Sequence, residues 1–234
     1  MALNTCNLCT CACFLDVSKA FDTVTHSILL KKLSAIGFRG PFLLLLESFL
    51  SDRSQMVSVN GVHSSKIFLK SGVPQGSILS PLLFNIYVND MCTAVSDCIL
   101  YQYADDTLLL TRHLSYPKSI EMLQRSSNQL MDWFNRNLLD INISKTKLVC
   151  FHNPLKVISL NVPFFLHTSD CILCHCDQIP YSDTVKYLGI LLDSDLSWNS
   201  HLTKICSQLR SVSCLLYHIK HLCLLVFASI LPIL

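Results

Sequence analysis

Apolar side chains recur every three or four positions in several stretches of this chain, which predicts helices with one buried face. Residues 26–36 are the clearest case, because Ile28, Leu29 and Leu33 share a face and Gly37 follows as a stop signal. Pro81 stands where another helix would begin. The predicted helices span residues 26–36, 41–50, 81–95 and 117–137, and more than one helix is expected within residues 198–222.

The period changes to two in other stretches, which predicts strands. Residues 55–69 alternate around Asn60-Gly61, a strong tight-turn signal, and so predict a hairpin. A second hairpin is expected over residues 99–111, where apolar arms flank a short acidic tip. One further strand is expected to begin near Cys13 and to end at Asp16. Residues 141–151 and 184–192 also predict strands, whereas the first dozen residues show no periodic pattern. Strands interleaved with helices indicate an α+β fold with helices on one face of a sheet.

Composition narrows the class of protein. The 234 residues are 51% hydrophobic and 15% charged, enough to bury a core and too apolar for long disordered tails. The net charge is only +2, whereas nucleic-acid-binding proteins are typically basic. There is no signal-peptide pattern and no apolar run of the ~20 residues that cross a membrane. We therefore expect an intracellular protein, in the cytoplasm or nucleus, with no transmembrane segment.

Cysteine is abundant, with thirteen in the chain, and without secretion these thiols are expected to be reduced. They form two dense clusters, one from Cys6 to Cys13 and one from Cys171 to Cys176. Tetrahedral zinc sites usually combine two short-spaced pairs, so these clusters could hold zinc if they met in space. Chance composition outside the main domain is the alternative interpretation.

The feature that suggests chemistry is a pair of acidic sites at the ends of apolar strands. Asp16 follows Phe14-Leu15, and Asp105 and Asp106 interrupt a predicted hairpin. Carboxylates that converge at a sheet edge repel one another unless a cation lies between them. Hard oxygen ligands favour Mg²⁺, and two such ions can stabilise the attacking and leaving oxygens of a phosphoryl transfer. On composition alone, adjacent aspartates would be interpreted as a solvated turn.

The residues around these aspartates form five motifs that resemble, in order, those of reverse transcriptases. The motifs are Phe14-Leu15-Asp16-Val17-Ser18-Lys19-Ala20-Phe21-Asp22, then Gly72-Val73-Pro74-Gln75-Gly76-Ser77 running on to Ser80-Pro81-Leu82-Leu83-Phe84, then Tyr103-Ala104-Asp105-Asp106, Lys145-Thr146-Lys147 after Asn142, and Tyr187-Leu188-Gly189. The wording of the motifs and a Trp-containing helix after the last one resemble non-LTR retrotransposons of the LINE or Jockey type. Group II intron enzymes share parts of the pattern.

The resemblance implies a polymerase palm, an α+β fold in which a ferredoxin-like antiparallel sheet carries helices on one face. Residues 13–192 would form the palm, 1–12 an unassigned N-terminal segment and 193–234 a partial helical thumb. Only fifteen residues precede Asp16, so the fingers region is expected to be largely missing and the chain to be cut short at both ends.

The resemblance also implies an activity, the RNA-directed addition of deoxynucleotides to a primer 3′-hydroxyl by two-metal phosphoryl transfer. Asp16 and Asp105, with the Val17 carbonyl, would hold two Mg²⁺ ions, with Mn²⁺ as a substitute, and Asp106 would tune the charge beside them. Lys145 would protonate or neutralise the leaving pyrophosphate, although an exposed loop lysine is often inert. The expected partners are an RNA template, a DNA primer and a deoxynucleoside triphosphate, with no membrane.

Three further residues are expected to bind the nucleotide. The Phe21 ring would exclude a ribose 2′-hydroxyl, and core packing is the alternative for the same residue. Gln75 and Gly76 would contact the incoming nucleotide and the template, with a plain turn as the alternative. Asp22 is expected to support the loop or cap the following helix. The residues that resemble a primer grip are Tyr187, Leu188 and Gly189.

Three other hypotheses compete with a polymerase fragment. A catalytically inactive remnant, decayed or domesticated, would expose an apolar surface toward the missing fingers and self-associate through it. A binding module could be stabilised by zinc at the second cysteine cluster. An RNA-dependent RNA polymerase is disfavoured by Phe21 and by Ala104 before the aspartates.

Overall fold

The computed structural model describes residues 8–153, 161–167 and 176–230. The chain divides into two compact units, Met1–Ser182 and Asp183–Leu234. Among the described residues, the first unit contains a sheet, hairpins and helices, and the second contains one hairpin and one helix.

The first unit is built on a four-stranded antiparallel sheet with the strand order β6-β7-β1-β8. The strands are β1 (Cys9–Asp16), β6 (Ile99–Tyr103), β7 (Asp106–His113) and β8 (Lys147–Phe151). The two central strands pair over their whole length, from Cys9 opposite His113 to Asp16 opposite Asp106. The acidic ends of β1 and β7 therefore meet at one edge of the sheet.

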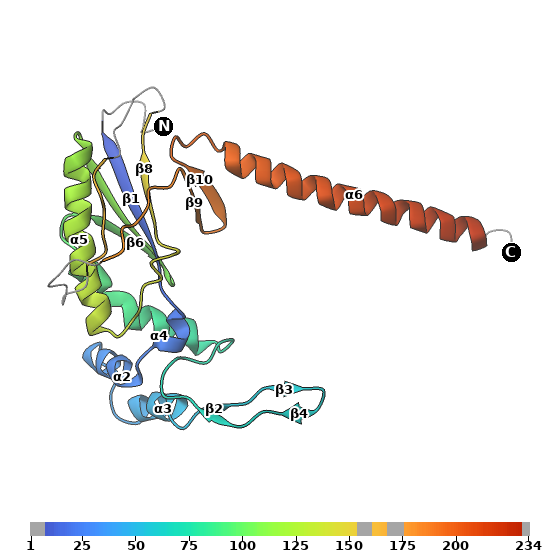
Figure 1. Ribbon diagram of the computed structural model, residues 1–234. Helices are drawn as coiled ribbons and strands as arrows, with labels where there is room; N and C mark the ends of the chain where they lie inside the picture. Colours follow the sequence, from blue (N-terminus) through green and yellow to red (C-terminus); the bar gives the residue numbers. More distant parts are fainter. Residues whose placement is uncertain (1–7, 154–160, 168–175, 231–234) are drawn as a thin grey trace. The chain divides into compact units, whose positions relative to one another are not determined.

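One face of this sheet is covered by α5 (Tyr116–Arg136), which runs alongside β1 and β7 (Figure 1). Leu123, Leu130 and Phe134 on this helix are almost fully buried in the same core as Leu109 of β7. Burying each large apolar side chain contributes roughly 1.5–3 kcal/mol. The predicted α+β palm fold, with an antiparallel sheet and helices on one face, is confirmed.

The remaining helices and hairpins of the first unit precede and follow the sheet strands. The helices are α1 (Ala20–Thr23), α2 (His26–Ala35), α3 (Pro41–Leu50) and α4 (Leu79–Val88), with a 3₁₀ helix η1 (Asn89–Ala94). The first predicted hairpin is confirmed as two short paired segments, β2 (Ser54–Gln55) with β5 (Ile67–Phe68) and β3 (Ser58–Val59) with β4 (Val62–His63). Periodicity thus predicted the helices α2 and α3 and the hairpin between residues 55 and 69.

Two predicted elements have different bounds in the structure. The helix expected over residues 81–95 begins earlier, at Leu79, and becomes a 3₁₀ helix after Val88. The prediction of a strand over residues 141–151 was wrong for its first half, because β8 begins only at Lys147. There the Thr146 amide and hydroxyl both donate to the Asn142 carbonyl, which closes a turn before β8.

The cysteines before Asp16 belong to the sheet. β1 begins at Cys9 rather than near Cys13, and the buried Cys9, Cys11 and Cys13 alternate along it as free thiols. Alternate positions on a strand are about 6.8 Å apart, too far for the three thiols to share one tetrahedral zinc ion. Among the described residues no group of three or more His, Cys, Asp or Glu side chains could hold a metal. Cys6 and residues 171–175 lie outside the described residues.

The second unit consists of a hairpin and a helix. The hairpin pairs β9 (Thr184–Tyr187) with β10 (Ile190–Asp193), and the helix α6 (Asn199–Ile230) is one continuous element rather than the several expected. Asp193 accepts hydrogen bonds from the Ser200 amide and the Ser197 hydroxyl at the start of α6. Hydrogen bonding from the Ser200 side chain is the largest cause that lowers the pKa of the Asp193 carboxyl, and the bonds from the Ser200 amide and the Ser197 hydroxyl add to it. No helix within the described ranges has both the length and the apolar character needed to cross a membrane.

Candidate active site

Acidic residues from two distant motifs meet at the edge of the palm sheet. Asp16 ends β1 and lies directly opposite Asp106, the first residue of β7. Directly opposed residues on antiparallel strands place their side chains on the same side of the sheet. Asp105 occupies the tight turn between β6 and β7, next to Ala104, which has a φ of 53°. Strand register therefore brings the three aspartates to one place.

An open cavity of about 470 Å³ lies at this edge. It is lined by Asp16, Val17, Ser18, Lys19, Ala20, Phe21, Gln75, Asp105, Asn142 and Lys145. The structure thus groups six of the residues selected from the motifs. Asp106 and Gly76 are absent from the lining but adjoin it, Asp106 across from Asp16 and Gly76 after Gln75. Sequence reasoning did not assign a role to Ser18, Lys19 or Asn142, although all three stand inside or beside a motif.

Lys145 reaches the cavity because the segment before it is hydrogen-bonded to the end of β1. The Asn142 amide donates to the Asp16 carbonyl at 2.7 Å, and the Ser18 amide donates to the Asp140 carbonyl at 2.8 Å. The Lys145 ammonium then lies 3.5 Å from the Asp16 carboxylate. The Lys145 side chain is exposed and that of Asp16 is partly exposed, so this ion pair contributes little stability. It does show that the Asp16 carboxylate is open to a cation.

The loop that carries Gln75 is hydrogen-bonded through its backbone to the segment after Asp16. The Gly72 amide donates to the Val24 carbonyl and the Val73 amide to the Phe21 carbonyl, both at 2.8 Å. Gly72 is buried with a φ of +87°, and a Cβ there would lie 2.8 Å from the Asp22 carbonyl oxygen. Only glycine allows the two backbones to approach so closely.

Phe21 both packs in the core and lines the cavity, the two alternatives that the sequence left open for it. Its ring stacks on Phe84 of α4, with centroids 4.7 Å apart and planes inclined by 29°. It is partly buried and packs against the core, yet it also lines the cavity that contains Asp16 and Asp105. Packing on Phe84 fixes the ring at the cavity wall, so the core role and a role in the cavity are compatible.

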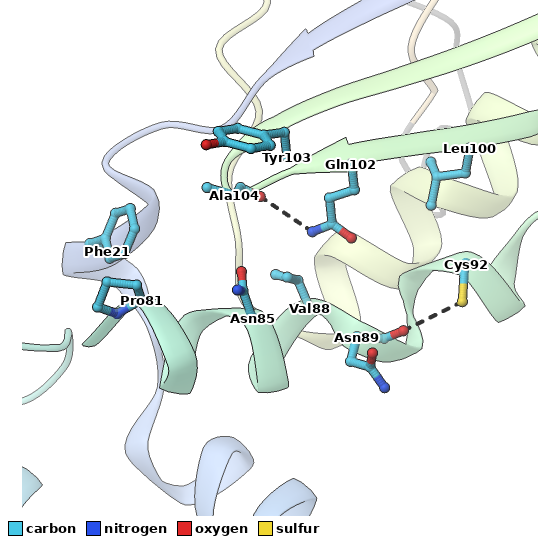
Figure 2. A pocket seen from close by; sticks show the side chains of 10 residues that line it. All are labelled: Phe21, Pro81, Asn85, Val88, Asn89, Cys92, Leu100, Gln102, Tyr103 and Ala104. Carbon is cyan, nitrogen blue, oxygen red and sulfur yellow. Dashed lines mark hydrogen bonds between the residues drawn. The ribbon is translucent and has the colours of Figure 1, made fainter. Parts of the chain in front are cut away.

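A second cavity of about 550 Å³ adjoins the first and shares Phe21 with it (Figure 2). The described residues of its lining include no charged side chain, and their polar groups are mainly the amides of Asn85, Asn89 and Gln102. The Gln102 amide donates to the Ala104 carbonyl at 3.3 Å, as Figure 2 shows. This bond helps to hold the turn that carries Asp105. Phe21, Pro81, Tyr103 and Ala104 of this lining belong to the motifs, but the sequence predicted no cavity here.

Asp16, Asp105 and the backbone carbonyl of Val17 are the groups that could hold a divalent metal here. They are hard oxygen donors of the kind that Mg²⁺ prefers, and a Mg²⁺ ion is usually bound by only one or two carboxylates together with water and substrate phosphates. The described lining provides two carboxylates, Asp16 and Asp105. This number suits a Mg²⁺ ion whose remaining ligands are water and the phosphate oxygens of a nucleotide. Lys19 and Lys145 add positive charge for phosphate oxygens.

The Tyr187-Leu188-Gly189 motif belongs to the second unit, where it forms the turn between β9 and β10. Leu188 and Gly189 both have positive φ values, 47° and 84°. Two consecutive positive φ values are typical of the tight turns whose twist suits a two-residue hairpin. The motif is therefore explained locally as a hairpin turn with an exposed tip.

A comparison with protein families decides the identity of the fold. The model described as reverse transcriptase (RNA-dependent DNA polymerase) matches residues 2–192. The chain belongs to the reverse transcriptase family. This match includes the residues before Cys13, in agreement with the early start of β1 in this reverse transcriptase domain.

The similar proteins come mainly from mobile elements. The domain is 33% identical over 207 residues to the RNA-directed DNA polymerase from mobile element jockey of Drosophila melanogaster, and 31% identical over 211 residues to that of Drosophila funebris. It is 35% identical over 208 residues to a probable RNA-directed DNA polymerase from transposon BS of Drosophila melanogaster. These alignments cover 84–86% of the chain and 21–22% of the relatives, so the chain spans about a fifth of their length. The predicted resemblance to Jockey-type elements is confirmed.

Solved structures support the fold. Telomerase from Candida tropicalis, truncated from its C-terminal domain, matches 82% of this reverse transcriptase chain with a TM-score of 0.53 at 13% identity, and the alignment covers 35% of that telomerase. Telomerase from Candida albicans in complex with a fragment of telomeric RNA matches 80% of the chain with a TM-score of 0.51 at 16% identity, over 30% of its own length.

Proposed function

We propose that this domain catalyses RNA-directed DNA synthesis, adding deoxynucleotides to the 3′-hydroxyl of a primer paired with an RNA template. The observation that supports it most is the meeting of Asp16 and Asp105, from two separate motifs, in one open cavity with Lys145. Membership of the reverse transcriptase family supplies the reaction class.

Asp16, Asp105 and the Val17 carbonyl would hold two Mg²⁺ ions, and Mn²⁺ could replace them. When bound, such ions lower the pKa of the primer hydroxyl and neutralise charge on the leaving pyrophosphate. Asp106, opposite Asp16, would add negative charge beside this pair and strengthen the attraction for cations.

The other residues of the cavity would position the nucleotide. Lys145 would exchange its ion pair with Asp16 for the phosphate oxygens and could deliver a proton to the leaving group. Phe21, fixed by Phe84, would lie against the sugar and exclude a 2′-hydroxyl. Gln75 and Gly76 would contact the nucleotide and the template, and Tyr187, Leu188 and Gly189 would contact the primer.

Primer extension tests this proposal. The purified chain is supplied with poly-rA, an oligo-dT primer, dTTP and Mg²⁺, and Asp105→Asn is assayed beside the wild type. We expect incorporation by the wild type and a loss of about 10²-fold or more in the variant, because a neutral amide oxygen attracts a divalent cation much less strongly than a carboxylate does. Equal incorporation by both proteins would contradict the proposed role of Asp105. Absence of incorporation by a folded wild type would favour a non-catalytic remnant.

A second candidate function, association through an apolar surface, has one observation in its favour. Large apolar side chains around α2 and α3 are more than half exposed, namely Ile36 (55%), Phe42 (53%), Leu44 (64%) and Leu45 (62%). Apolar patches of this kind commonly mark interaction surfaces. Sedimentation velocity would detect association that rises with concentration and falls in Phe42→Ser/Leu45→Gln. A concentration-independent monomer would exclude it.

A further inference from the structure

Asp22 makes a contact that the motifs did not suggest. Its carboxylate accepts a hydrogen bond of 2.9 Å from the side-chain amide of Gln75, which is 53 positions away in the sequence. The backbone reinforces the pairing, because the Ser71 hydroxyl donates to the Asp22 carbonyl at 3.0 Å and Gly72 lies directly against that carbonyl. Asp22 therefore accepts one bond through its side chain and one through its backbone from the same loop.

The chemistry of this contact fixes the orientation of the Gln75 amide. A carboxylate only accepts hydrogen bonds, whereas a primary amide has a donating NH₂ group and an accepting oxygen on opposite sides. The NH₂ group of Gln75 must therefore face Asp22, and its carbonyl oxygen Oε1 must face away. Gln75 lines the cavity that contains Asp16 and Asp105, so an acceptor is available there for a ligand.

The ligand group must be a hydrogen-bond donor common to all four deoxynucleotides, if the domain copies any template. Exocyclic amino groups do not qualify, because thymine has none. The sugar 3′-hydroxyl qualifies, since every deoxynucleotide has one and it can donate. We propose that Asp22 is a positioning residue that orients Gln75 to accept a hydrogen bond from the 3′-hydroxyl of the incoming nucleotide.

This inference rests on the proposed function, and it predicts a measurable preference. The domain should bind dTTP more tightly than its 3′-deoxy analogue ddTTP by about tenfold, the worth of one hydrogen bond in a cavity. Asp22→Leu should abolish that preference, since nothing then orients the amide. Asp22→Asn should retain part of it, because asparagine can either accept from or donate to Gln75 and so permits both orientations.

Titration by ¹H–¹⁵N NMR of the full chain tests this without requiring catalysis. The Gln75 side-chain NH₂ signal is identified by its loss in Gln75→Glu, and dissociation constants for Mg²⁺-dTTP and Mg²⁺-ddTTP are measured in the wild type and in the two Asp22 variants. Asp132→Asn, at an exposed position of α5, is the matched control. We expect the Gln75 signal to move in both Asp22 variants and the preference for dTTP to fall in the order wild type, Asn, Leu.

Three results would overturn the inference. One is a Gln75 signal that Asp22→Leu leaves unmoved, and another is equal affinity of the wild type for dTTP and ddTTP. The third is a preference that Asp22→Asn retains in full while Asp22→Leu loses it, because Asp22 would then only anchor the loop. Failure of primer extension alone would contradict the proposed function and leave these binding measurements decisive for Asp22.

Discussion

Single residues at the sheet edge that carries the candidate site are held in conformations that few side chains tolerate. Gly72 combines a positive φ with contact against the Asp22 backbone, and Ala104 has a φ of 53° in the turn that carries Asp105. Non-glycine residues with positive φ cost roughly 1–2 kcal/mol and often occur at functional sites. The surrounding hydrogen bonds, such as that from Gln102 to Ala104, offset this cost.

Gly72→Ala should therefore be strongly destabilising. A methyl group there would lie 2.8 Å from the Asp22 carbonyl oxygen and 2.9 Å from the Asp22 Cα. We expect the free energy of unfolding to fall by about 2–4 kcal/mol, the sum of positive-φ strain and overpacking. Urea denaturation measures it.

Gly61→Ala is the matched control, because Gly61 has a similar φ of +80° with nothing within 4 Å of its virtual Cβ. It should cost only about 1 kcal/mol, the strain of the backbone alone. Equal costs at the two glycines would show that the close approach at Gly72 does not matter.

One buried tyrosine connects three helices of the first unit, α2, α4 and α5, through hydrogen bonds. Tyr87 of α4 is fully buried, and its hydroxyl donates to the Asn137 carbonyl at 2.5 Å after α5 and accepts from the Thr25 amide at 3.4 Å before α2. Burial raises the pKa of this hydroxyl. One side chain thus satisfies backbone groups at the ends of two helices that are far apart in the sequence.

Tyr87→Phe should lower the free energy of unfolding by about 1–2 kcal/mol, because it leaves the buried Asn137 carbonyl without its donor. Tyr101→Phe serves as the control, since Tyr101 is 46% exposed, and it should change the stability by less than about 0.5 kcal/mol. Chemical denaturation of both variants would decide it. A neutral Tyr87→Phe would mean that water replaces the lost donor.

Elements were predictable where one local signal dominated. The apolar period set α2 and α3, and Asn60-Gly61 set the first hairpin. The strand expected from residue 141 failed because Thr146 turns the chain back on Asn142. The start of β1 at Cys9 was missed because its partners on β7 and β8 lie about a hundred or more positions away.

In the candidate site, too, the sequence predicted what local motifs determine and not what depends on distant contacts. Motifs pointed to Asp16, Asp105 and Lys145, which line one cavity. They did not predict the bond between Asp22 and Gln75. They also did not predict that motif residues such as Phe21 and Tyr103 line a second cavity with Gln102, because both features depend on contacts between distant segments. Local patterns carry no information on which loops meet.

The first unit as a whole should lose stability in alkali. Burial raises the pKa of the Cys98 thiol from an ordinary value of 9.0 to about 11, and burial raises that of Cys13 further. Between these values the unfolded thiol ionises while the folded thiol keeps its proton, so the folded state binds more protons. The stability from Cys98 is therefore full below about pH 9 and is lost as the pH rises through 11.

Urea unfolding of the wild type and Cys98→Ser at several pH values measures this loss. The variant cannot ionise at this position, so its free energy of unfolding should fall less steeply than that of the wild type above pH 9. Cys92→Ser, at an exposed position, should follow the wild type. Parallel curves for the wild type and Cys98→Ser would contradict the raised pKa.

The proposed reaction of the whole molecule depends on Asp16 and Asp105 attracting the same cations, and metal-directed cleavage of the chain tests this most directly. Fe²⁺ is added in place of Mg²⁺, with ascorbate and peroxide, so that radicals cut the backbone beside the bound ion. We predict cuts next to Asp16 and next to Asp105, suppressed by excess Mg²⁺ and absent from both sites in either Asp16→Asn or Asp105→Asn. Cuts at one aspartate that persist when the other is changed, or cuts at neither, would contradict a shared metal site.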